Sequence, residues 1–210
     1  MDSSITRGLY RDITDFAHST PTWFQHSFEL FTEAGLLIFG ALFVVVWWRA
    51  RSGSSAAIAV AVLAPLATAT GYVVSESFKS IVDEERPCRT VTEAATSLAA
   101  CPPVGDWSFP SNHSTIAGAA AVALALAWPK IALFTVPMAL LMAFSRVFVG
   151  VHYPHDVVVG LVLGAVVTVL FVKVLTKPAG AVLMTMRGSG TGVLAWFAGP
   201  GRRVGAHRKV

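Results

Sequence analysis

Apolar residues are concentrated in long runs along this chain, separated by short polar segments. A membrane-spanning helix needs about 20 predominantly apolar residues, and five runs reach or approach that length. The pattern predicts an all-α fold, an integral membrane helical bundle of about five transmembrane helices. The expected helices cover residues 34–48, 56–78, 114–128, 131–144 and 157–175.

Small residues indicate where two of these helices approach each other. Gly160 and Gly164 form a GxxxG pair in the fifth run, and the third run is rich in alanine. Both features fit close helix packing, although such residues are also common in membrane helices in general.

The two ends of the chain have a different pattern. Residues 1–31 carry aromatic residues at helical spacing mixed with acidic ones, which is typical of an amphipathic helix on the membrane interface. Residues 182–198 contain Arg187 and several glycines, so we expect a surface or disordered tail there. The expected domains are an interfacial segment (1–33), a membrane-embedded domain (34–178) and a basic cytoplasmic tail (179–210).

Composition supports the membrane assignment. Of the 210 residues, 54% are hydrophobic and only 13% are charged, whereas soluble domains carry about 25% charged residues. The net charge of +4 does not indicate a nucleic-acid partner, because the basic residues lie beside apolar runs and in the terminal sequence GRRVGAHRKV. That distribution favours an anionic membrane surface.

Loop charges predict the orientation. The loops on one side of the expected bundle are basic, and the positive-inside rule makes that side cytoplasmic. The N-terminus and the long loop before the third helix then face outward. This loop contains Cys88 and Cys101, which can form a disulfide in an oxidising compartment and are otherwise two free thiols. The basic residues on the inner side are Arg49, Arg51, Lys130, Lys173, Lys177 and Arg187.

Three polar segments lie on the outer side: KSIVDEERP, FPSNHST and SRVFVGVHYPHD. Ionisable residues are costly near hydrocarbon, so such segments indicate function by default. Each also has a structural interpretation, because Lys79 and Arg86 can snorkel to the interface, Ser111 can cap a helix and His113 can be a satisfied polar residue. Their convergence on one membrane face favours a shared site.

The cationic residues of these segments suit a phosphate ligand. Lys79, Arg86 and Arg146 together favour a multiply charged anion, since guanidinium groups match phosphate oxygens. Ser111 lies at the start of the third helix and adds a donor at a positive helix end.

The histidines suit catalysis. His152 and Asp156 are four residues apart, so the carboxylate can hold one ring nitrogen while the other acts as a nucleophile. His113 comes from a different helix and can act as general acid. No further cluster of Asp, His or Cys indicates a metal site, so we expect neither a metal nor a cofactor. The pattern predicts metal-independent phosphoryl transfer through a phosphohistidine.

The spacing KxxxxxxRP, PSxH and SRxxxxxHxxxD resembles the three-part signature of the type 2 phosphatidic acid phosphatase superfamily. The resemblance implies a helical bundle in which His152 is the nucleophile, Asp156 orients it and His113 protonates the leaving group. Asn112 stands where the family usually has glycine, and its backbone amide is a further candidate donor. The implied phosphate-binding residues are Lys79, Arg86, Ser111, Asn112 and Arg146.

An outward-facing site in a membrane favours lipid substrates. The short chain and the sequence ELFTEAGLL resemble the small bacitracin-resistance-type undecaprenyl-diphosphate phosphatases. This resemblance implies hydrolysis of a polyprenyl (undecaprenyl or decaprenyl) diphosphate to the monophosphate, at the extracytoplasmic face of a bacterial plasma membrane. The alternatives are a phosphatidate or phosphatidylglycerophosphate phosphatase with the same residues, and a non-catalytic protein that binds or translocates lipid phosphates.

Four further ionisable residues have structural interpretations. We expect Glu76 to pair with Lys79 one helical turn later. Glu33 can face the pocket or mark the membrane boundary, and the boundary interpretation is favoured. Arg89 can contact the second phosphate of a diphosphate substrate, but a solvated loop residue is favoured. We expect His155, which matches no position of the signature, to lie at the interface.

Overall fold

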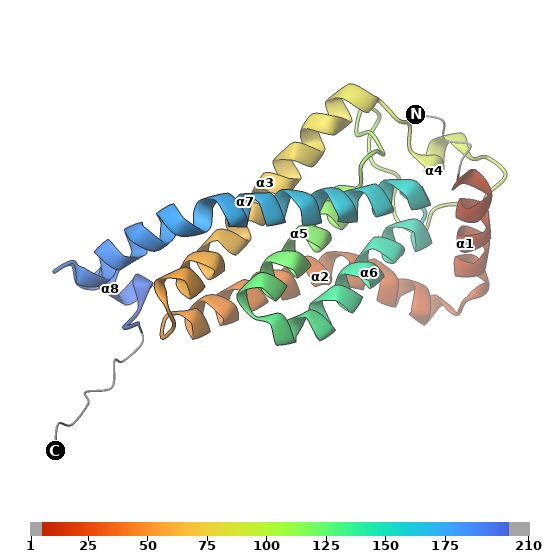
Figure 1. Cartoon of the computed structure of the whole chain (residues 1–210). Helices are drawn as coiled ribbons and strands as arrows, with labels where there is room; N and C mark the ends of the chain where they lie inside the picture. Colours follow the sequence, from red (N-terminus) through yellow and green to blue (C-terminus); the bar gives the residue numbers. More distant parts are fainter. Residues whose placement is uncertain (1–5, 202–210) are drawn as a thin grey trace, which may run out of the picture.

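The computed structural model describes residues 6–201, and the regular secondary structure in that range is helical. The long helices run side by side in one bundle (Figure 1) and are α2 (Thr22–Ala50), α3 (Ser55–Val82), α5 (Asn112–Ala127), α6 (Ala132–Phe148) and α7 (Pro154–Gly188). The shorter elements are α1 (Arg7–Ser19), α4 (Pro87–Thr90), the 3-10 helix η2 (Pro129–Ile131) and α8 (Gly192–Ala198).

Four segments of the described chain are long and apolar enough to cross a membrane, which makes this a multi-pass membrane protein. They are Thr22–Ala50, Ser55–Thr90, Pro129–Phe148 and Pro154–Gly188. The third expected span corresponds to α5, which is apolar but has only 16 residues. The all-α membrane bundle is therefore confirmed, with four helices that satisfy the length rule.

Helix α5 lies at the centre of the bundle and packs closely against α7. A Cβ atom added at Gly160 would lie 2.6 Å from the carbonyl oxygen of Ser111, and one at Gly118 would lie 2.9 Å from the Cα of Leu161. The predicted role of the GxxxG pair in close packing is confirmed, because only glycine allows these backbones to approach so closely.

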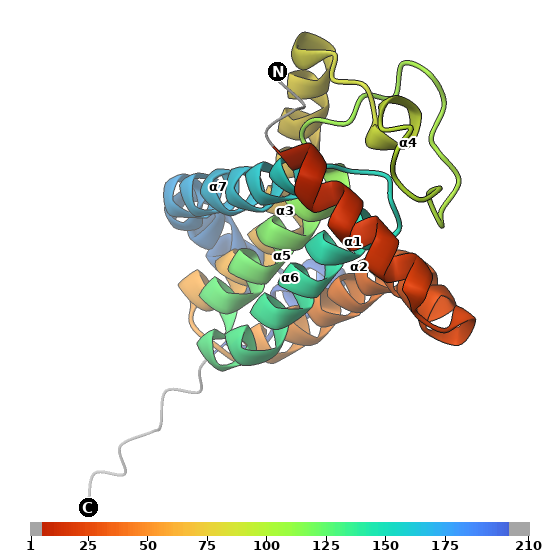
Figure 2. The same cartoon turned by 90° about the vertical axis from the view of Figure 1, so that its right-hand side faces the viewer.

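The predicted interfacial segment over residues 1–33 comprises parts of two helices, and its place at the membrane interface stays a prediction. Helix α1 is separate and crosses the end of the bundle (Figure 2), whereas residues 22–33 are the first three turns of the spanning helix α2. The aromatic residues that suggested an interfacial helix pack on α6: the Phe28 ring stacks on Phe148 at 4.2 Å, and Phe24 lies 5.9 Å from the same ring.

The predicted surface or disordered tail over residues 182–198 is ordered and helical, and most of its residues are exposed. Helix α7 continues through Pro178 to Gly188, and α8 folds back against the bundle. The Trp196 ring lies 5.6 Å from Trp47, and its carbonyl accepts a hydrogen bond from the Arg51 Nε at 2.9 Å. The rest of the predicted basic tail, residues 202–210, lies outside the described residues.

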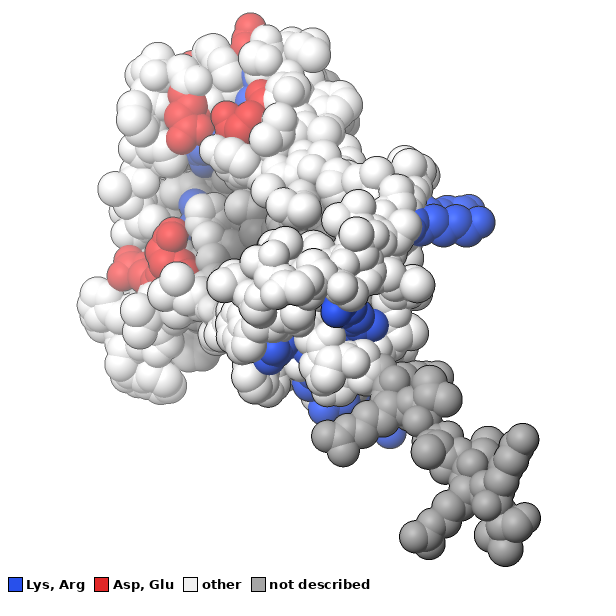
Figure 3. Space-filling view, turned by 90° about the vertical axis from the view of Figure 1, so that its left-hand side faces the viewer, with Lys and Arg blue, Asp and Glu red and all other residues white. Residues whose placement is uncertain are grey.

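Charge is distributed unequally between the two ends of the bundle. In the view onto the end that carries α8, lysine and arginine side chains gather on the near surface, and the acidic side chains lie farther back (Figure 3). Within residues 6–201, the acidic side chains lie toward the other end of the bundle. They belong to α1, to the halves of α2, α3 and α7 that lie away from α8, or to the loop after α3.

That loop connects α3 to α5 and covers the end of the bundle near α1 (Figure 1). Cys88 in α4 and Cys101 form a disulfide whose Cα atoms are 6.0 Å apart, as predicted. The loop is further tied to the bundle by a hydrogen bond from the Ala99 amide to the Val149 carbonyl, at 3.2 Å. It supplies several residues of the site described next.

Candidate active site

His152 lies in the short turn between α6 and α7 and is almost completely buried, with 2% of its surface exposed. Its Nδ1 lies 3.3 Å from the Oδ2 of Asp156, one helical turn later in the first turn of α7. The same carboxylate oxygen accepts a hydrogen bond from the Tyr153 amide at 2.9 Å and another from the Ser108 hydroxyl. Asp156 is thus fixed by its own helix start and can hold the imidazole in one orientation.

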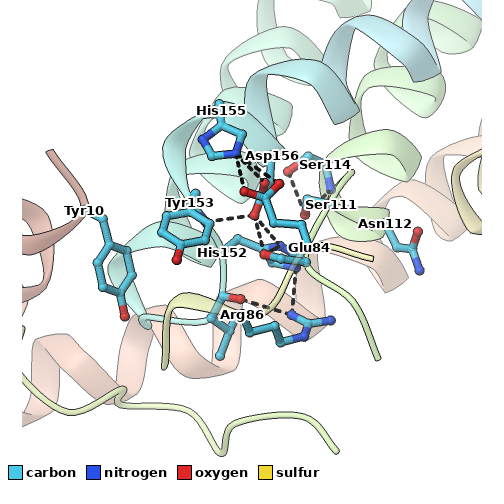
Figure 4. Close-up of polar contacts among 12 residues, drawn as sticks. Tyr10, Glu84, Arg86, Ser111, Asn112, Ser114, His152, Tyr153, His155 and Asp156 are labelled. Carbon is cyan, nitrogen blue, oxygen red and sulfur yellow. Dashed lines mark hydrogen bonds and ion pairs between the residues drawn. The ribbon is translucent and has the colours of Figure 1, made fainter. Parts of the chain in front are cut away.

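The other ring nitrogen of His152 meets a guanidinium group (Figure 4). Nε2 lies 3.1 Å from Nη1 of Arg86, which also donates to the Val151 carbonyl at 3.0 Å. Burial, and then the positive charge of Arg86, lower the pKa of His152 well below its usual value of 6.5. The ring is therefore neutral near pH 7, with a lone pair on the nitrogen that faces Arg86.

A cavity of about 340 Å³ opens beside these two residues. It brings together residues from all three polar segments of the sequence, although they are up to 73 positions apart along the chain. Its cationic and imidazole side chains make it a space suited to an anion. The lining residues are Tyr72, Lys79, Arg86, Pro102, Asp106, Asn112, His113, Ile116, Arg146 and His152.

A carboxylate already lies between two of the cations. Oδ1 of Asp106 is 2.8 Å from Nη2 of Arg86 and 3.1 Å from Nζ of Lys79. Partial burial raises the pKa of Asp106, but hydrogen bonds from Arg86 and Lys79 outweigh it, so the pKa is lowered overall. Lys79 and Arg86 are themselves buried, and Asp106 balances their charge.

The third cation, Arg146, projects from the end of α6 and is held by α2. Its Nη1 donates to the Thr32 hydroxyl at 2.9 Å and lies 3.7 Å from Oε1 of Glu33. The Nε of Arg146 is buried without a hydrogen-bond partner among the described residues, and the Arg146 side chain lines the cavity. His113, at the start of α5, has its Nε2 3.2 Å from the same Glu33 oxygen.

The two remaining predicted phosphate-binding residues, Ser111 and Asn112, lie at the start of α5. The Ser111 hydroxyl is fully buried, accepts a hydrogen bond from the Ser114 amide at 3.5 Å and is absent from the cavity wall. The structure thus favours the helix-cap interpretation of Ser111. Asn112 does line the cavity, with its side-chain oxygen accepting a hydrogen bond from Ser75 at 2.7 Å and its amide donating to Glu76.

Residues 6–201 contain one group of possible metal ligands that the sequence did not indicate. Glu84, His155 and Asp156 offer ligand atoms within 4.8 Å of one another. His155 Nε2 lies 3.1 Å from Oε1 of Glu84 and 3.2 Å from Oδ1 of Asp156 (Figure 4). A protonated His155 accounts for this geometry, because it bridges two buried carboxylates that would otherwise repel each other.

Sequence reasoning missed or misplaced several residues of the site. Glu33 contacts His113, which favours the alternative that it faces the pocket, and His155 contacts the Asp156 carboxylate of the third polar segment. Arg89 is tied to the loop rather than solvated, 3.6 Å from Glu85 and bonded to the Pro102 carbonyl. Glu76 does approach Lys79, at 3.9 Å. Asp106 carries no signal in sequence, since its loop has no periodic pattern.

The fold and the site define a membrane-embedded helical protein with a cationic, histidine-bearing cavity at one end of its bundle. The chain belongs to the PAP2 superfamily, whose sequence profile matches residues 59–178. That range contains all three polar segments, and it leaves out all of α1 and α2.

Two relatives are similar to this chain in sequence. It is 30% identical over 142 residues to undecaprenyl-diphosphatase BcrC of Bacillus subtilis, which covers 68% of this chain and 70% of the relative. It is 37% identical over 103 residues to an undecaprenyl-diphosphatase of Sulfolobus acidocaldarius, covering 49% of this chain and 48% of that protein. The chain thus spans about half the length of the second relative.

The structural similarity extends over most of the bundle. The transmembrane PAP2 type phosphatidylglycerolphosphate phosphatase from Bacillus subtilis superposes with a TM-score of 0.61, over 85% of this chain and 88% of that one. The sequence identity in this superposition is 20%. The comparison therefore supports the fold and carries no information about the substrate.

Proposed function

We propose that this protein is a metal-independent lipid phosphatase that hydrolyses a polyprenyl diphosphate to the monophosphate through a phosphohistidine on His152. The observation that carries the proposal is the His152 imidazole, which is buried, oriented by Asp156 and open to a cavity that also contains Lys79, Arg86 and Arg146. A protein that only binds lipid phosphates needs the cations but has no use for an oriented, neutral imidazole.

In the first step His152 attacks the terminal phosphorus. A bond forms between Nε2 and phosphorus while the bond from phosphorus to the bridging oxygen breaks, and His113 gives that oxygen a proton. Asp156 stabilises the positive charge that develops on the His152 ring through its contact with Nδ1. Lys79, Arg86 and Arg146 stabilise the charge on the phosphoryl oxygens, and the lipid monophosphate leaves.

In the second step a water molecule hydrolyses the phosphohistidine. His113, neutral after the first step, takes a proton from the water as its oxygen bonds to phosphorus. The phosphorus–nitrogen bond breaks, inorganic phosphate is released and His152 returns to its neutral form. No step requires a metal, since cationic side chains supply the positive charge.

The polyprenyl substrate is inferred from the relatives, both of which are named undecaprenyl-diphosphatases. The chemistry agrees with that substrate, because a lipid monophosphate is a better leaving group than an alkoxide. If α5 is counted as a span, the chain crosses the membrane five times, and the basic end marked by α8 is cytoplasmic by the positive-inside rule. The cavity then faces the extracytoplasmic side of a bacterial plasma membrane.

Phosphate release by the purified protein in detergent, with EDTA present, tests the proposal. The substrates are undecaprenyl diphosphate, phosphatidate and phosphatidylglycerophosphate, and the His152→Ala variant is the blank. We expect release in the presence of EDTA with a clear preference for the diphosphate. Preference for a glycerolipid would assign the same chemistry to phospholipid metabolism, and a strict metal requirement would contradict the mechanism.

A further inference from the structure

A second pair of carboxylate and histidine lies at the mouth of the cavity. Oε1 of Glu33 is 3.2 Å from Nε2 of His113, and the Glu33 side chain is 66% exposed whereas that of His113 is 22% exposed. Glu33 projects from α2, outside the region that the family profile matches. We propose that Glu33 is a positioning residue, whose carboxylate orients His113 and favours the protonated form that the leaving group requires. The inference rests on the proposed phosphohistidine route.

The charges around His113 explain why a carboxylate is needed there. Lys79 of α3 and Arg146 of α6 line the same cavity, and His152 faces it from the turn before α7. Adding a proton to His113 in such surroundings is unfavourable unless a negative charge lies close by. The Asp106 carboxylate is engaged with Lys79 and the cavity's remaining cation, Arg86, which leaves Glu33 as the carboxylate in contact with His113.

The contact also determines how the proton moves. With the Nε2 proton donated to Glu33, the protonated ring has one further N–H, at Nδ1. That proton passes to the bridging oxygen as its bond to phosphorus breaks, and the neutral ring stays held to Glu33 through Nε2. During hydrolysis Nδ1 takes one proton from the attacking water, so the ring ends the cycle protonated as it began.

Helix α2 contributes more than one contact to the site. Thr32, the residue before Glu33, accepts the hydrogen bond from Arg146, and Glu33 itself lies 3.7 Å from the same Nη1 atom. Two consecutive residues of α2 therefore hold the acid and one phosphate-binding cation. This explains how a helix outside the three signature segments can determine the geometry of their side chains.

A leaving-group series separates an effect on the acid from a structural effect. The Glu33→Gln variant keeps the size of the side chain and removes its charge, and Glu33 is exposed enough for the fold to tolerate the change. Glu29→Gln is the matched control, because Glu29 lies one turn earlier on α2 and pairs only with His26 among the described residues. Both variants and the wild type are assayed with undecaprenyl diphosphate, phosphatidate and p-nitrophenyl phosphate.

We expect Glu33→Gln to lower kcat with phosphatidate by about 10- to 100-fold, within the range of general-acid contributions. The loss should be smaller with the diphosphate and smallest with p-nitrophenyl phosphate, whose leaving group needs no proton. The alkaline limb of the rate profile should also move to lower pH, while Glu29→Gln matches the wild type. Equal losses with every substrate, or an unmoved limb, would overturn the inference. Absence of turnover by the wild type would instead overturn the proposed function.

Discussion

Arg86 places its Nη1 atom 3.1 Å from Nε2 of His152, so a phosphate-binding cation contacts the nitrogen assigned as nucleophile. A positive charge in this position opposes protonation of the ring, in addition to the effect of burial. It keeps the nucleophile unprotonated and places a guanidinium beside the position of the phosphorus that His152 attacks.

The lowered pKa of His152 predicts the acidic side of the pH profile. A lowered pKa means that the imidazole stays neutral, and hence nucleophilic, to a lower pH than an ordinary histidine. We expect the acidic limb of kcat/KM, which reports groups of the free enzyme, to fall below pH 6.5, the usual imidazole value. If kcat/KM already falls at a pH above 6.5 as the solution is acidified, the pKa of His152 is not lowered.

Asp106 predicts a variant that binds phosphate more tightly. Its carboxylate forms ion pairs with Arg86 and Lys79. In the proposed mechanism the substrate phosphate has to bind the same two cations. In Asp106→Asn this negative charge is gone, and we expect the inhibition constant of inorganic phosphate to fall roughly 3- to 10-fold. Glu93→Gln, an exposed change in the same loop, is the charge-matched control. Weaker phosphate binding would mean that Asp106 orients the two cations instead of competing for them.

The contact between α5 and α7 predicts a strong stability effect at a single glycine. A Cβ atom at Gly164 would collide with the carbonyl oxygen of Thr115 and lie 2.8 Å from the Ala119 amide nitrogen, whereas one at Gly40 meets nothing within 4 Å. We expect Gly164→Ala to destabilise the protein by about 1–3 kcal/mol, the range for overpacking, and Gly40→Ala to have little effect. Thermal unfolding in detergent measures both, and equal Tm values would contradict the packing.

The disulfide predicts sensitivity to reductants. Cys88 and Cys101 close a loop of 13 residues, and a crosslink of that span stabilises a protein by about 3 kcal/mol in the chain-entropy account. We expect dithiothreitol to lower the Tm of the wild type and to leave that of the Cys88→Ser, Cys101→Ser double variant unchanged. Free thiols in protein purified from membranes without reductant would contradict both the crosslink and the outward orientation of the loop.

The spanning helices could be predicted because the membrane requires a long apolar run wherever a helix crosses it. The helix ends were harder to predict, because an apolar run shows which residues lie in the hydrocarbon and not where the helix begins or ends. Helix α2 starts at Thr22, twelve residues before its apolar run, since Phe24 and Phe28 find partners on α6. Helix α7 similarly continues past Pro178, where sequence alone suggested an end.

The site was predictable to the extent that it follows fixed spacings. His152 and Asp156 are four positions apart, and this spacing determines their contact through helix geometry alone. Glu33, Asp106 and His155 come to the site through tertiary packing, because α2 and the loop after α3 fold over the motif residues. Their own sequence surroundings carry no pattern that distinguishes them from boundary or loop residues.

The central claim, a phosphohistidine on His152, is tested most directly by trapping the intermediate. Substrate labelled in its terminal phosphate is mixed with the protein, the reaction is quenched at alkaline pH, where phosphohistidine survives, and the labelled peptide is identified by mass spectrometry. The account predicts label on His152 in the wild type, and neither label nor turnover in a folded His152→Ala variant. Turnover by that variant, or label on another residue, would contradict it.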